Sequence, residues 1–426
     1  MIKARKIKLR LDVAQANMVR EHQMEAAACW NEIVVLANNH YRDNDGKWIS
    51  KSDLQAKTKN RFKLHSQSVQ ALTDKYCANR DTIAELRRKG DKKARYPYRE
   101  KTYLTIPFKQ MAIKIQKDGT IRLSLSNGNY LYTGIKPDRE INTAELIWDG
   151  KGYVFSYTAE YEIADMATDG LVAGIDLGEI HPVAITAEDG EGLIVSGRTI
   201  RAAKQWRNKS LAKLSRRISK CKKGSRQWKK LIRAKAILRN RTDNQVRDML
   251  HKSTRQAINW CLEKGISDIV VGDLKGVEKN TKKHRRLNKK ARQKVSQMEY
   301  GTLKKYLKYK AEEAGIKSCF VNERGTSKNC PECGSENHPK GRIYSCKACG
   351  FKSHRDGKAG FLIARKKHKH LQLPEKFTFA HQQCAPKYRK RMRRESLPTP
   401  ACVDGPDVTL SSPVKAEPLV GALSAA

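Results

Sequence analysis

The pattern of apolar and polar residues divides the first 168 residues into three parts. Residues 6–13, KIKLRLDV, alternate between basic and apolar side chains, which predicts an edge strand. Residues 14–95 place apolar side chains at helical spacing, whereas the following residues return to short strand-like segments separated by Gly-containing turns. A lone strand, a helical insertion and a run of strands predict a β-barrel over 1–13 and 96–168, interrupted by a helical lobe.

The pattern after the barrel alternates between strands and helices. LVAGIDLGEIHPVAIT (171–186) predicts a β-hairpin, and residues 201–250 predict a long helical hairpin that turns at KKGS (222–225). The elements expected next are a helix, a strand, a helix, a strand and a final helix, at 252–264, 267–276, 296–315, 316–323 and 357–369. This order predicts an α/β domain formed by 169–323 and 353–372.

Two Cys-x-x-Cys pairs interrupt this domain. CPEC (330–333) and CKAC (346–349) are separated by twelve residues, and each pair runs into a glycine. Such a spacing is typical of a zinc ribbon, in which four thiolates close a tetrahedral site. The segment 324–352 is therefore predicted to be a zinc ribbon with Cys330, Cys333, Cys346 and Cys349 as ligands. Disulfides are the weaker alternative, because no secretory segment precedes the pairs and the other seven cysteines are scattered singly.

The C-terminal region loses apolar periodicity. Beyond about Leu373 the sequence is dominated by Pro, Ser and Ala, and residues 390–426 are predicted to be disordered. We therefore expect 373–426 to be a largely disordered tail.

Charge indicates the kind of partner. The chain carries 87 Lys and Arg against 44 Asp and Glu, a formal net charge of +43 on 426 residues. The segment 201–250 alone has 18 basic residues and two acidic ones, and 280–294 is also strongly basic. Such an excess predicts a polyanionic partner, so the barrel is better interpreted as a nucleic-acid platform than as a pure scaffold. No apolar run approaches the roughly 18 residues of a membrane span, and we expect a cytoplasmic, nucleoid-associated protein of a prokaryote that does not bind membranes.

The order of elements is similar to that of an RNase H-like α/β domain. Nucleases of that architecture hold two divalent ions with carboxylates at strand ends and on a late helix, and the ions activate a water and stabilise the leaving oxygen. Asp176 in GIDLG ends the first strand, and Asp356 in HRDGKAG begins the final helix. These two positions match the first and last acids of such a site.

A composite of motifs extends this similarity to a family. Six short sequences are spread over about 171–370, namely GIDLG, VVGDLKG, YLKYKAEEAGI, ERGTSKNCPECG, YSCKACGF and HRDGKAGFLIAR. Together they resemble the RuvC-type nuclease half of TnpB. TnpB is a family of transposon-encoded RNA-guided DNA endonucleases related to compact type V CRISPR effectors. The plan of 1–165 is similar to the family's wedge barrel with its inserted recognition lobe. The resemblance implies structural zinc, catalytic magnesium, a guide RNA from the transposon end, and target double-stranded DNA beside a short protein-read motif.

One position departs from the family pattern. The usual middle acid is a Glu in the strand motif written here as VVGDLKG, and Gly272 stands in its place. Asp273 is adjacent, but a shift of one residue in a strand turns the side chain to the other face. Glu323 ends the next strand, which in this fold lies parallel to the Gly272 strand. We therefore predict Asp176, Glu323 and Asp356 as catalytic and magnesium-binding residues, with Glu312, Asp273 or a loss of cleavage as alternatives.

Histidines give a weaker signal. His181, His338 and His354 have side chains that bind metals, but four cysteines already satisfy a zinc ion. The three histidines are accordingly expected to be solvated loop residues.

Three functions remain open at this point. The favoured hypothesis is a TnpB-type RNA-guided DNA endonuclease that works by two-metal phosphodiester hydrolysis. The second is a nuclease-inactive RNA-guided DNA-binding protein or repressor of the same fold. The third, a DNA transposase without guide RNA, ranks lowest because the basic hairpin suits a large structured RNA. The sequence leaves open the DNA motif, the guide, and whether the protein is a monomer or a dimer.

Overall fold

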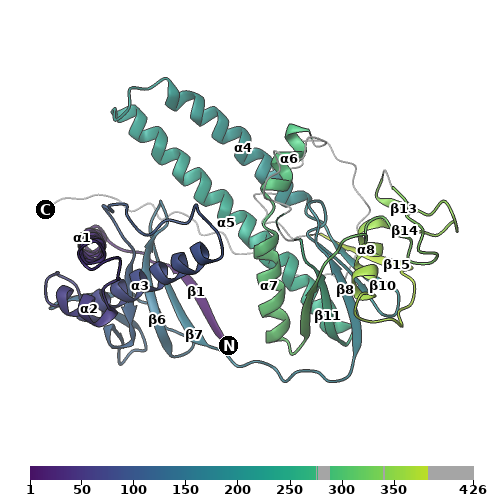
Figure 1. Cartoon of the computed structure of the whole chain (residues 1–426), viewed down its shortest axis with the longest axis horizontal. Helices are drawn as coiled ribbons and strands as arrows, with labels where there is room; N and C mark the ends of the chain where they lie inside the picture. The colour runs from purple at the N-terminus through teal and green to yellow at the C-terminus, as the bar shows by residue number, and fades with distance from the viewer. Residues whose placement is uncertain (275, 277–287, 339–340, 382–426) are drawn as a thin grey trace, which may run out of the picture. The chain divides into compact units, whose positions relative to one another are not determined.

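The computed structural model describes residues 1–274, 276, 288–338 and 341–381 (Figure 1). The tail expected at 390–426 and most of the basic loop expected at 280–294 lie outside these residues. Among the described helices, none combines the length and the apolar character that crossing a membrane requires.

The N-terminal part consists of two antiparallel sheets and three helices around one core. Its strands are β1 (Ile2–Lys8), β2 (Ile106–Lys109), β3 (Ile113–Ile115), β4 (Ile121–Ser126), β5 (Asn129–Tyr132), β6 (Ile141–Trp148) and β7 (Tyr153–Glu160), with a 3₁₀ turn η1 (Gln110–Ala112) between β2 and β3. One sheet has the order β1-β7-β6-β2 and the other β3-β4-β5. Buried side chains of both sheets and of the helices form a single hydrophobic cluster.

The helices of this part are inserted between β1 and β2 along the chain. They are α1 (Val13–Asp43), α2 (Lys51–Thr58) and α3 (Ser66–Arg88). The first strand lies earlier than the predicted 6–13, because Asp12 is the N-cap of α1 and its side chain accepts a hydrogen bond from Gln15 N at 2.7 Å. The chain therefore turns into the helix before the alternating pattern ends.

The C-terminal part is built on a six-stranded sheet with the order β12-β11-β8-β9-β10-β15. Its strands are β8 (Leu171–Asp176), β9 (Val183–Ala187), β10 (Glu191–Val195), β11 (Ile266–Gly272), β12 (Lys317–Val321) and β15 (Lys376–Ala380). The strands β8, β11 and β12 are mutually parallel, whereas β8, β9 and β10 form an antiparallel meander. The mixed α+β class predicted from the sequence is confirmed.

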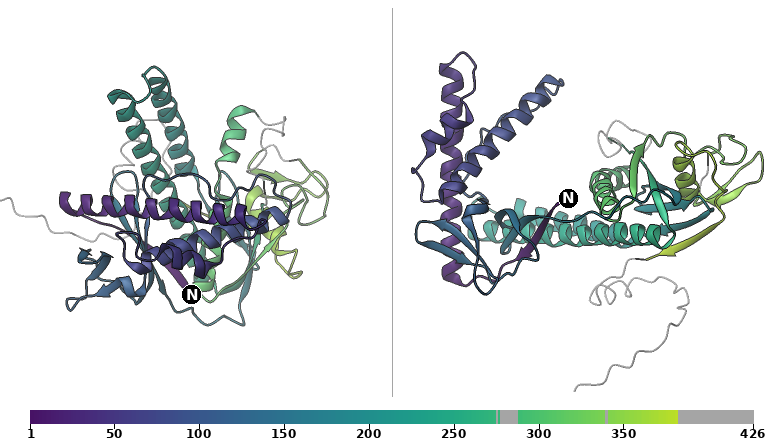
Figure 2. Two further views of the ribbon diagram at one scale, coloured as in Figure 1. Left: turned by 60° about the vertical axis from the view of Figure 1, so that its left-hand side comes forward. Right: turned by 90° about the horizontal axis from the view of Figure 1, so that it is seen from below.

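The helices of this part are α4 (Arg198–Ser219), α5 (Arg226–Glu263), α6 (Lys289–Ser296), α7 (Tyr300–Glu313) and α8 (Arg355–Ala364). The helices α4 and α5 run side by side as the expected hairpin, which Figure 1 and the left panel of Figure 2 show. An ion pair of 2.6 Å between Arg207 and Asp243 joins the two arms. The separate helix expected at 252–264 is absent, because α5 continues without interruption to Glu263.

A glycine contact places α8 directly on the first strand of the sheet. A Cβ atom added to Gly174 in β8 would lie 2.0 Å from the carbonyl oxygen of Gly360 in α8. Only a residue without a side chain permits this approach. The contact fixes the start of α8 relative to the end of β8, the two places where the predicted acids Asp176 and Asp356 lie.

The sheet includes a strand that the sequence analysis assigned to the tail. Residues 376–380 form β15, which pairs in parallel with β10 through five residues, from Glu191 opposite Lys376 to Val195 opposite Ala380. The boundary expected at residue 372 is therefore too early. Five residues of weak pattern carried too little signal to be recognised, and the edge of β10 supplies their partner.

Candidate active site and zinc ribbon

Three predicted acids gather around one cavity of the C-terminal part. Asp176 is the last residue of β8, Asp356 lies in the first turn of α8, and Glu323 follows β12 by two residues. All three line a cavity of about 240 Å³. The convergence follows from the topology, because parallel neighbouring strands bring their carboxyl ends to the same edge of a sheet.

The side chain of Glu323 fills the space beside Gly272. The register of β11 and β12 sets Gly272 opposite Val321, two residues before Glu323. A Cβ atom added to Gly272 would lie 2.7 Å from Glu323 Oε2 and 2.9 Å from Ile363 Cδ1. The carboxylate of Glu323 thus occupies the place where a side chain at position 272 would begin.

Burial raises the pKa values of two of these acids. Burial raises the pKa of Asp176 well above its usual range, and the charges of Glu323 and Asp356 raise it further. Burial also raises the pKa of Glu323 to about 7, although the nearby Lys366 ammonium lowers it. Among the described residues, the buried Oε2 of Glu323 has no hydrogen-bond donor. The unpartnered oxygen of Glu323 is the kind of ligand that Mg²⁺ prefers, so this side of the cavity fits a divalent cation.

Asp356 differs from the other two acids because cations surround it. Burial alone would raise its pKa, but a hydrogen bond from His181 and the charges of Arg342 and Arg355 lower the pKa to about 2. His181 Nδ1 lies 2.7 Å from Asp356 Oδ2, Arg342 Nη1 donates to the same oxygen at 2.9 Å, and Arg355 Nε lies 3.4 Å from Oδ1. Asp356 is therefore ionised and fixed in orientation.

The expectation that the histidines are solvated loop residues is wrong for His181 and His354 and agrees with the structure for His338. His181 is only 8% exposed and is bonded to Asp356, and its ring lies 5.3 Å from the half-buried ring of His354. The side chain of His338 is 76% exposed. Position along the chain gave no indication of this difference, because His181 becomes buried only when the β8–β9 turn packs against α8.

The other acids considered for the middle position lie elsewhere. Asp273 forms an ion pair with Lys304, and Glu312 is a half-exposed residue 3.8 Å from Lys308 on the same helix. Neither belongs to the described lining of the carboxylate cavity.

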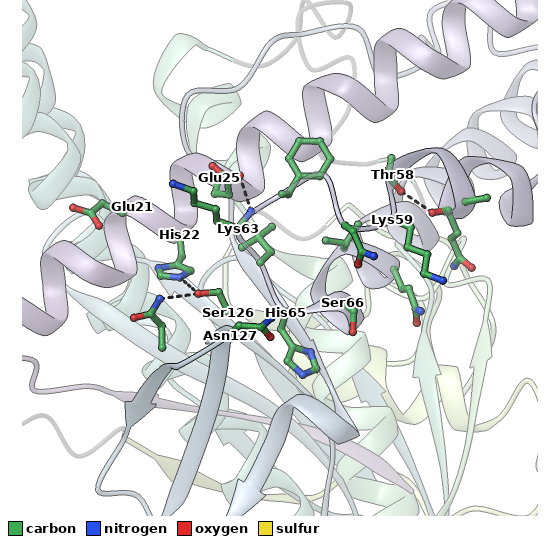
Figure 3. A pocket seen from close by; sticks show the side chains of 18 residues that line it. Glu21, His22, Glu25, Thr58, Lys59, Lys63, His65, Ser66, Ser126 and Asn127 are labelled. Atoms are coloured by element: carbon green, nitrogen blue, oxygen red, sulfur yellow. Dashed lines mark hydrogen bonds between the residues drawn. The ribbon is translucent and has the colours of Figure 1, made fainter.

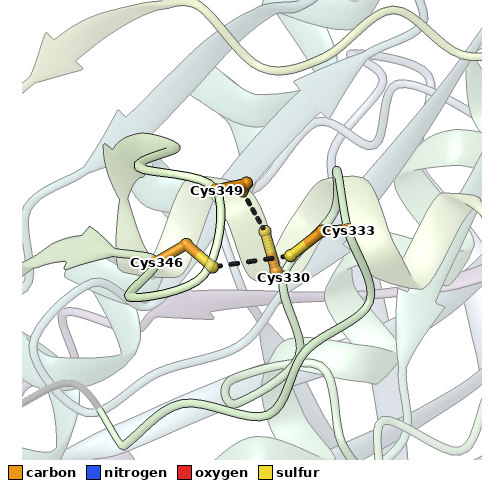
Figure 4. A group of neighbouring side chains, drawn as sticks. All are labelled: Cys330, Cys333, Cys346 and Cys349. Carbon is orange, nitrogen blue, oxygen red and sulfur yellow. Dashed lines mark hydrogen bonds between the residues drawn. The ribbon is translucent and has the colours of Figure 1, made fainter.

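The four predicted zinc ligands form a compact cluster (Figure 4). The Sγ atoms of Cys330 and Cys349 are 3.6 Å apart, as are those of Cys333 and Cys346. Zinc–sulfur bonds of about 2.3 Å place the sulfurs of a tetrahedron about 3.8 Å apart, so the cluster fits a zinc ion. The ribbon adds a small hairpin of β13 (Ile343–Ser345) and β14 (Lys352–His354).

The two cysteine knuckles have the same local construction. Gly334 N donates to Cys330 O at 3.1 Å, and Gly350 N donates to Cys346 O at 3.2 Å. The two glycines have φ angles of +75° and +78°, a conformation that glycine adopts without strain. The pairing of Cys-x-x-Cys with a following Gly thus specifies each knuckle locally.

A buried lysine connects the ribbon to α8. Lys358 is 0% exposed, its Nζ donates to Asn329 O at 2.8 Å, and the ammonium lies 3.9 Å from the centre of the Tyr344 ring. Burial lowers the pKa of Lys358 to about 8. The helix that carries Asp356 is therefore held by the zinc ribbon as well as by the sheet.

A larger cavity, which sequence patterns did not indicate, lies in the N-terminal part (Figure 3). It has a volume of about 1130 Å³ and is lined by residues of α1, the α2–α3 connection and the β4–β5 turn. His22 Nε2 lies 3.0 Å from Ser126 Oγ, and Glu25 accepts a hydrogen bond of 2.8 Å from Lys63 N. Among the described residues, it shares no lining residue with the carboxylate cavity.

The structure combines a mixed α+β fold with a zinc-ribbon-like cysteine cluster, and comparisons with known proteins show what the chain is similar to. Residues 156–278 match the OrfB_IS605 family model, described as a probable transposase. Residues 300–363 match the model of the Cas12f1-like TNB domain. The resemblance to the TnpB family that the motifs indicated is confirmed by these matches.

Two relatives extend the comparison. Over 127 residues the chain is 28% identical to the TnpB-like protein MJ0751 of Methanocaldococcus jannaschii. The aligned region covers 30% of this chain and 44% of that protein. The chain thus spans less than half of this curated relative. A structure of a Cas12f1–sgRNA–target DNA complex matches 85% of this chain and 84% of that chain with a TM-score of 0.58 and 13% identity. At that identity the likeness shows the fold alone.

Proposed function

We propose that this protein is an RNA-guided, Mg²⁺-dependent DNA endonuclease of the TnpB type. The observation that supports the proposal most is the position of Glu323, whose carboxylate lies beside Gly272 in the cavity that Asp176 and Asp356 also line. An acid is thus available where the family pattern lost one. The matches to TnpB-related family models support the same class.

In this proposal Asp176, Glu323 and Asp356 hold the catalytic magnesium. The bound metal would activate a water and stabilise the oxygen that leaves the phosphodiester. His181 and Arg342 keep the Asp356 carboxylate ionised and in one orientation through contacts of 2.7 and 2.9 Å. The ribbon contributes indirectly, since Lys358 ties it to the helix that carries Asp356.

The proposed partners are a guide RNA and a complementary DNA target. The matching Cas12f1 structure is a complex with sgRNA and target DNA. The α4–α5 hairpin carries most of the 18 basic residues of 201–250, a density suited to nucleic-acid backbones. Base pairing would select the target, while the protein would contact the backbone and a short motif beside it.

A nuclease-inactive binding protein of the same fold is the second candidate. It is favoured by the cations around Asp356, because Arg342 and Arg355 already neutralise a carboxylate that a metal would need. In that case Glu323 would fill space beside Gly272 without a catalytic role.

Two measurements test the proposal. Sequencing of RNA that copurifies with the protein should yield a defined species from the end of a transposon, and absence of bound RNA would favour a transposase without a guide. The complex should then cut a plasmid that matches the guide when Mg²⁺ is added, and the Asp176→Ala variant should not. Stable guide-dependent binding of the plasmid without cleavage would instead support the binding protein.

A further inference from the structure

A second cavity with a basic lining adjoins the carboxylate cavity. It has a volume of about 320 Å³ and lies between α4 and α6. Its basic lining residues are Arg201, Lys204, Lys209, Lys290 and Lys294. The described lining includes a single carboxylate, Glu179. This imbalance makes the cavity a site for an anion.

Hydrogen bonds fix the walls of this basic cavity. Lys204 is only 7% exposed, and its Nζ donates to Gln297 O at 2.5 Å. The side-chain amides of Asn208 and Gln297 donate to each other at 3.0 and 3.2 Å. Since Gln297 directly follows α6, these bonds hold α6 against α4. The wall formed by Lys204, Asn208 and Gln297 is therefore fixed by hydrogen bonds. Lys209 and Lys290, in contrast, are exposed.

Among the described residues, two of the five basic lining residues have a carboxylate partner, and three do not. Lys204 lies 3.6 Å from Glu299, and Arg201 pairs with Glu179 at 2.9 Å. Within the part of the chain that the structure describes, Lys209, Lys290 and Lys294 form no ion pair. Three lysines without a described carboxylate partner thus line one cavity, and a phosphate group carries the charge and the acceptor oxygens that would satisfy them.

Glu179 is common to both cavities. It lines the carboxylate cavity together with Asp176 and Asp356, and it lines the basic cavity through its ion pair with Arg201. The Glu179–Arg201 pair is thus the wall between the two. A DNA strand that enters the carboxylate cavity would have its neighbouring phosphates next to this wall.

We propose that the basic cavity binds a backbone phosphate of the DNA strand that is cut, and so positions the adjacent phosphodiester between Asp176, Glu323 and Asp356. This inference rests on the proposed endonuclease function. Phosphate contacts set the register of a protein on a nucleic acid and carry no sequence information. Binding energy from a group remote from the reacting bond would thus hold the strand in place for cleavage. The shared wall favours the DNA strand over the guide RNA as the occupant.

A pair of matched double variants tests the proposal in the full-length protein. Lys290→Gln with Lys294→Gln removes two cations of the cavity. Lys305→Gln with Lys317→Gln removes two exposed cations of α7 and β12, outside the cavity lining and outside the basic segments 201–250 and 280–294. The probe is a short oligothymidylate, and its dissociation constant is measured over a range of salt concentrations without Mg²⁺. Thermal unfolding checks that each variant is folded.

The cavity variant should lose about 0.7 from the slope of log K against log salt, since one phosphate contact to a single strand contributes about 0.7. The surface variant should keep the wild-type slope, and Lys290→Arg with Lys294→Arg should restore it. Equal losses in the cavity and surface variants, or an unchanged slope in the cavity variant, would overturn the proposal. A loss of guide-RNA affinity with unchanged oligothymidylate binding would assign the cavity to the guide and overturn the DNA assignment.

Cleavage kinetics separate this inference from the function on which it rests. If the wild type cuts its target, the cavity variant should show a KM raised several-fold with a smaller change in kcat. A wild type that does not cut would count against the endonuclease proposal, whereas the metal-free binding comparison would still decide whether the cavity holds a DNA phosphate.

Discussion

The zinc ribbon and the carboxylate cavity both gather side chains suited to a metal, but they draw them from very different distances along the chain. The four cysteines fall within 330–349, and each Cys-x-x-Cys knuckle closes its own backbone hydrogen bond. The cavity combines a strand end, a residue after another strand and a helix start, and its His181–Asp356 bond spans 175 residues. Local geometry specifies the first site, and the sheet specifies the second.

The two sites also differ in how complete they are. The ribbon offers four sulfurs around one point, which is the closed arrangement of a structural zinc site. The carboxylates line an open cavity, and the buried Oε2 of Glu323 has no donor among the described residues. A closed site stabilises a fold, whereas an open site leaves room for a substrate. The predictions below test this contrast, from the largest expected effect to the smallest.

The largest effect should come from the relocated acid. Glu323→Gln removes a charge from the cavity while keeping the side-chain shape. Loss of a residue that only hydrogen-bonds to a metal ligand lowers activity roughly 10- to 100-fold, and loss of a metal ligand itself should lower the cleavage rate by more than that. Guide and target binding should be unchanged, and Asp176→Ala should behave in the same way. Asp273→Asn is the control, because Asp273 pairs with Lys304 outside the cavity lining. Normal cleavage by Glu323→Gln with an inactive Asp273→Asn would show that the wrong acid was chosen.

The ribbon should lose its metal when one thiolate is removed. Cys346→Ser should lower the zinc content measured by elemental analysis, because three thiolates no longer close the tetrahedral site. Cys261→Ser is the matched control, since Cys261 is buried in α5 away from the ribbon and should leave the zinc content unchanged. Undiminished zinc in the Cys346 variant would refute the ligand set.

A substitution at Gly272 should show that it shares its space with Glu323. Gly272→Ala places a methyl group 2.7 Å from Glu323 Oε2 and should destabilise the protein by about 1 kcal/mol, the low end for overpacking, because the side-chain ends of Glu323 and Ile363 can shift. Gly301→Ala is the control, because a Cβ atom at that helical position meets nothing within 4 Å. Thermal unfolding measures both.

The exchange of the two positions sharpens the same test. Gly272→Glu combined with Glu323→Ala should cleave better than either single variant, because the acid returns to the strand while its competitor for space is removed. A double variant no more active than the singles would argue that the two positions do not substitute for each other.

A smaller, pH-dependent effect should appear in the metal-free protein. The pKa of Glu323 is raised from 4.5 to about 7, so the folded state binds this proton more tightly than the unfolded state. The stability of the wild type should therefore fall relative to Glu323→Gln as the pH rises from about 4.5 to about 7, and the difference should remain at higher pH. Unfolding temperatures measured across this window check the prediction. Parallel curves for the two proteins would contradict it.

The smallest effect is expected at the C-terminus. Deletion of 390–426 should leave the unfolding temperature nearly unchanged, because the Pro-, Ser- and Ala-rich sequence lacks apolar periodicity. Deletion from residue 373 onward also removes β15 and uncovers the edge of β10, so it should lower the unfolding temperature. A similar result for both deletions would show that β15 contributes little to the sheet.

Local patterns were sufficient where a feature depends on neighbours in the chain. Helical spacing and the KKGS turn predicted the α4–α5 hairpin, and Cys-x-x-Cys followed by Gly predicted the two knuckles. The predictions of strand boundaries were wrong where a helix N-cap or a pairing strand distant in the sequence outweighed the local pattern. Asp12 ended the first strand early, and β10 turned a segment assigned to the tail into a strand.

The sequence by itself determined the α+β class, the cysteine tetrad, the basic character and the motifs shared with the TnpB family. Only the tertiary structure decided that Glu323 lies against Gly272, that His181 is buried on Asp356, and that five basic side chains line a cavity beside the acids. The physical reason is that periodicity and short spacings record contacts within a few residues. The parallel register of β8, β11 and β12 and the close approach of α8 bring together residues that no local pattern connects.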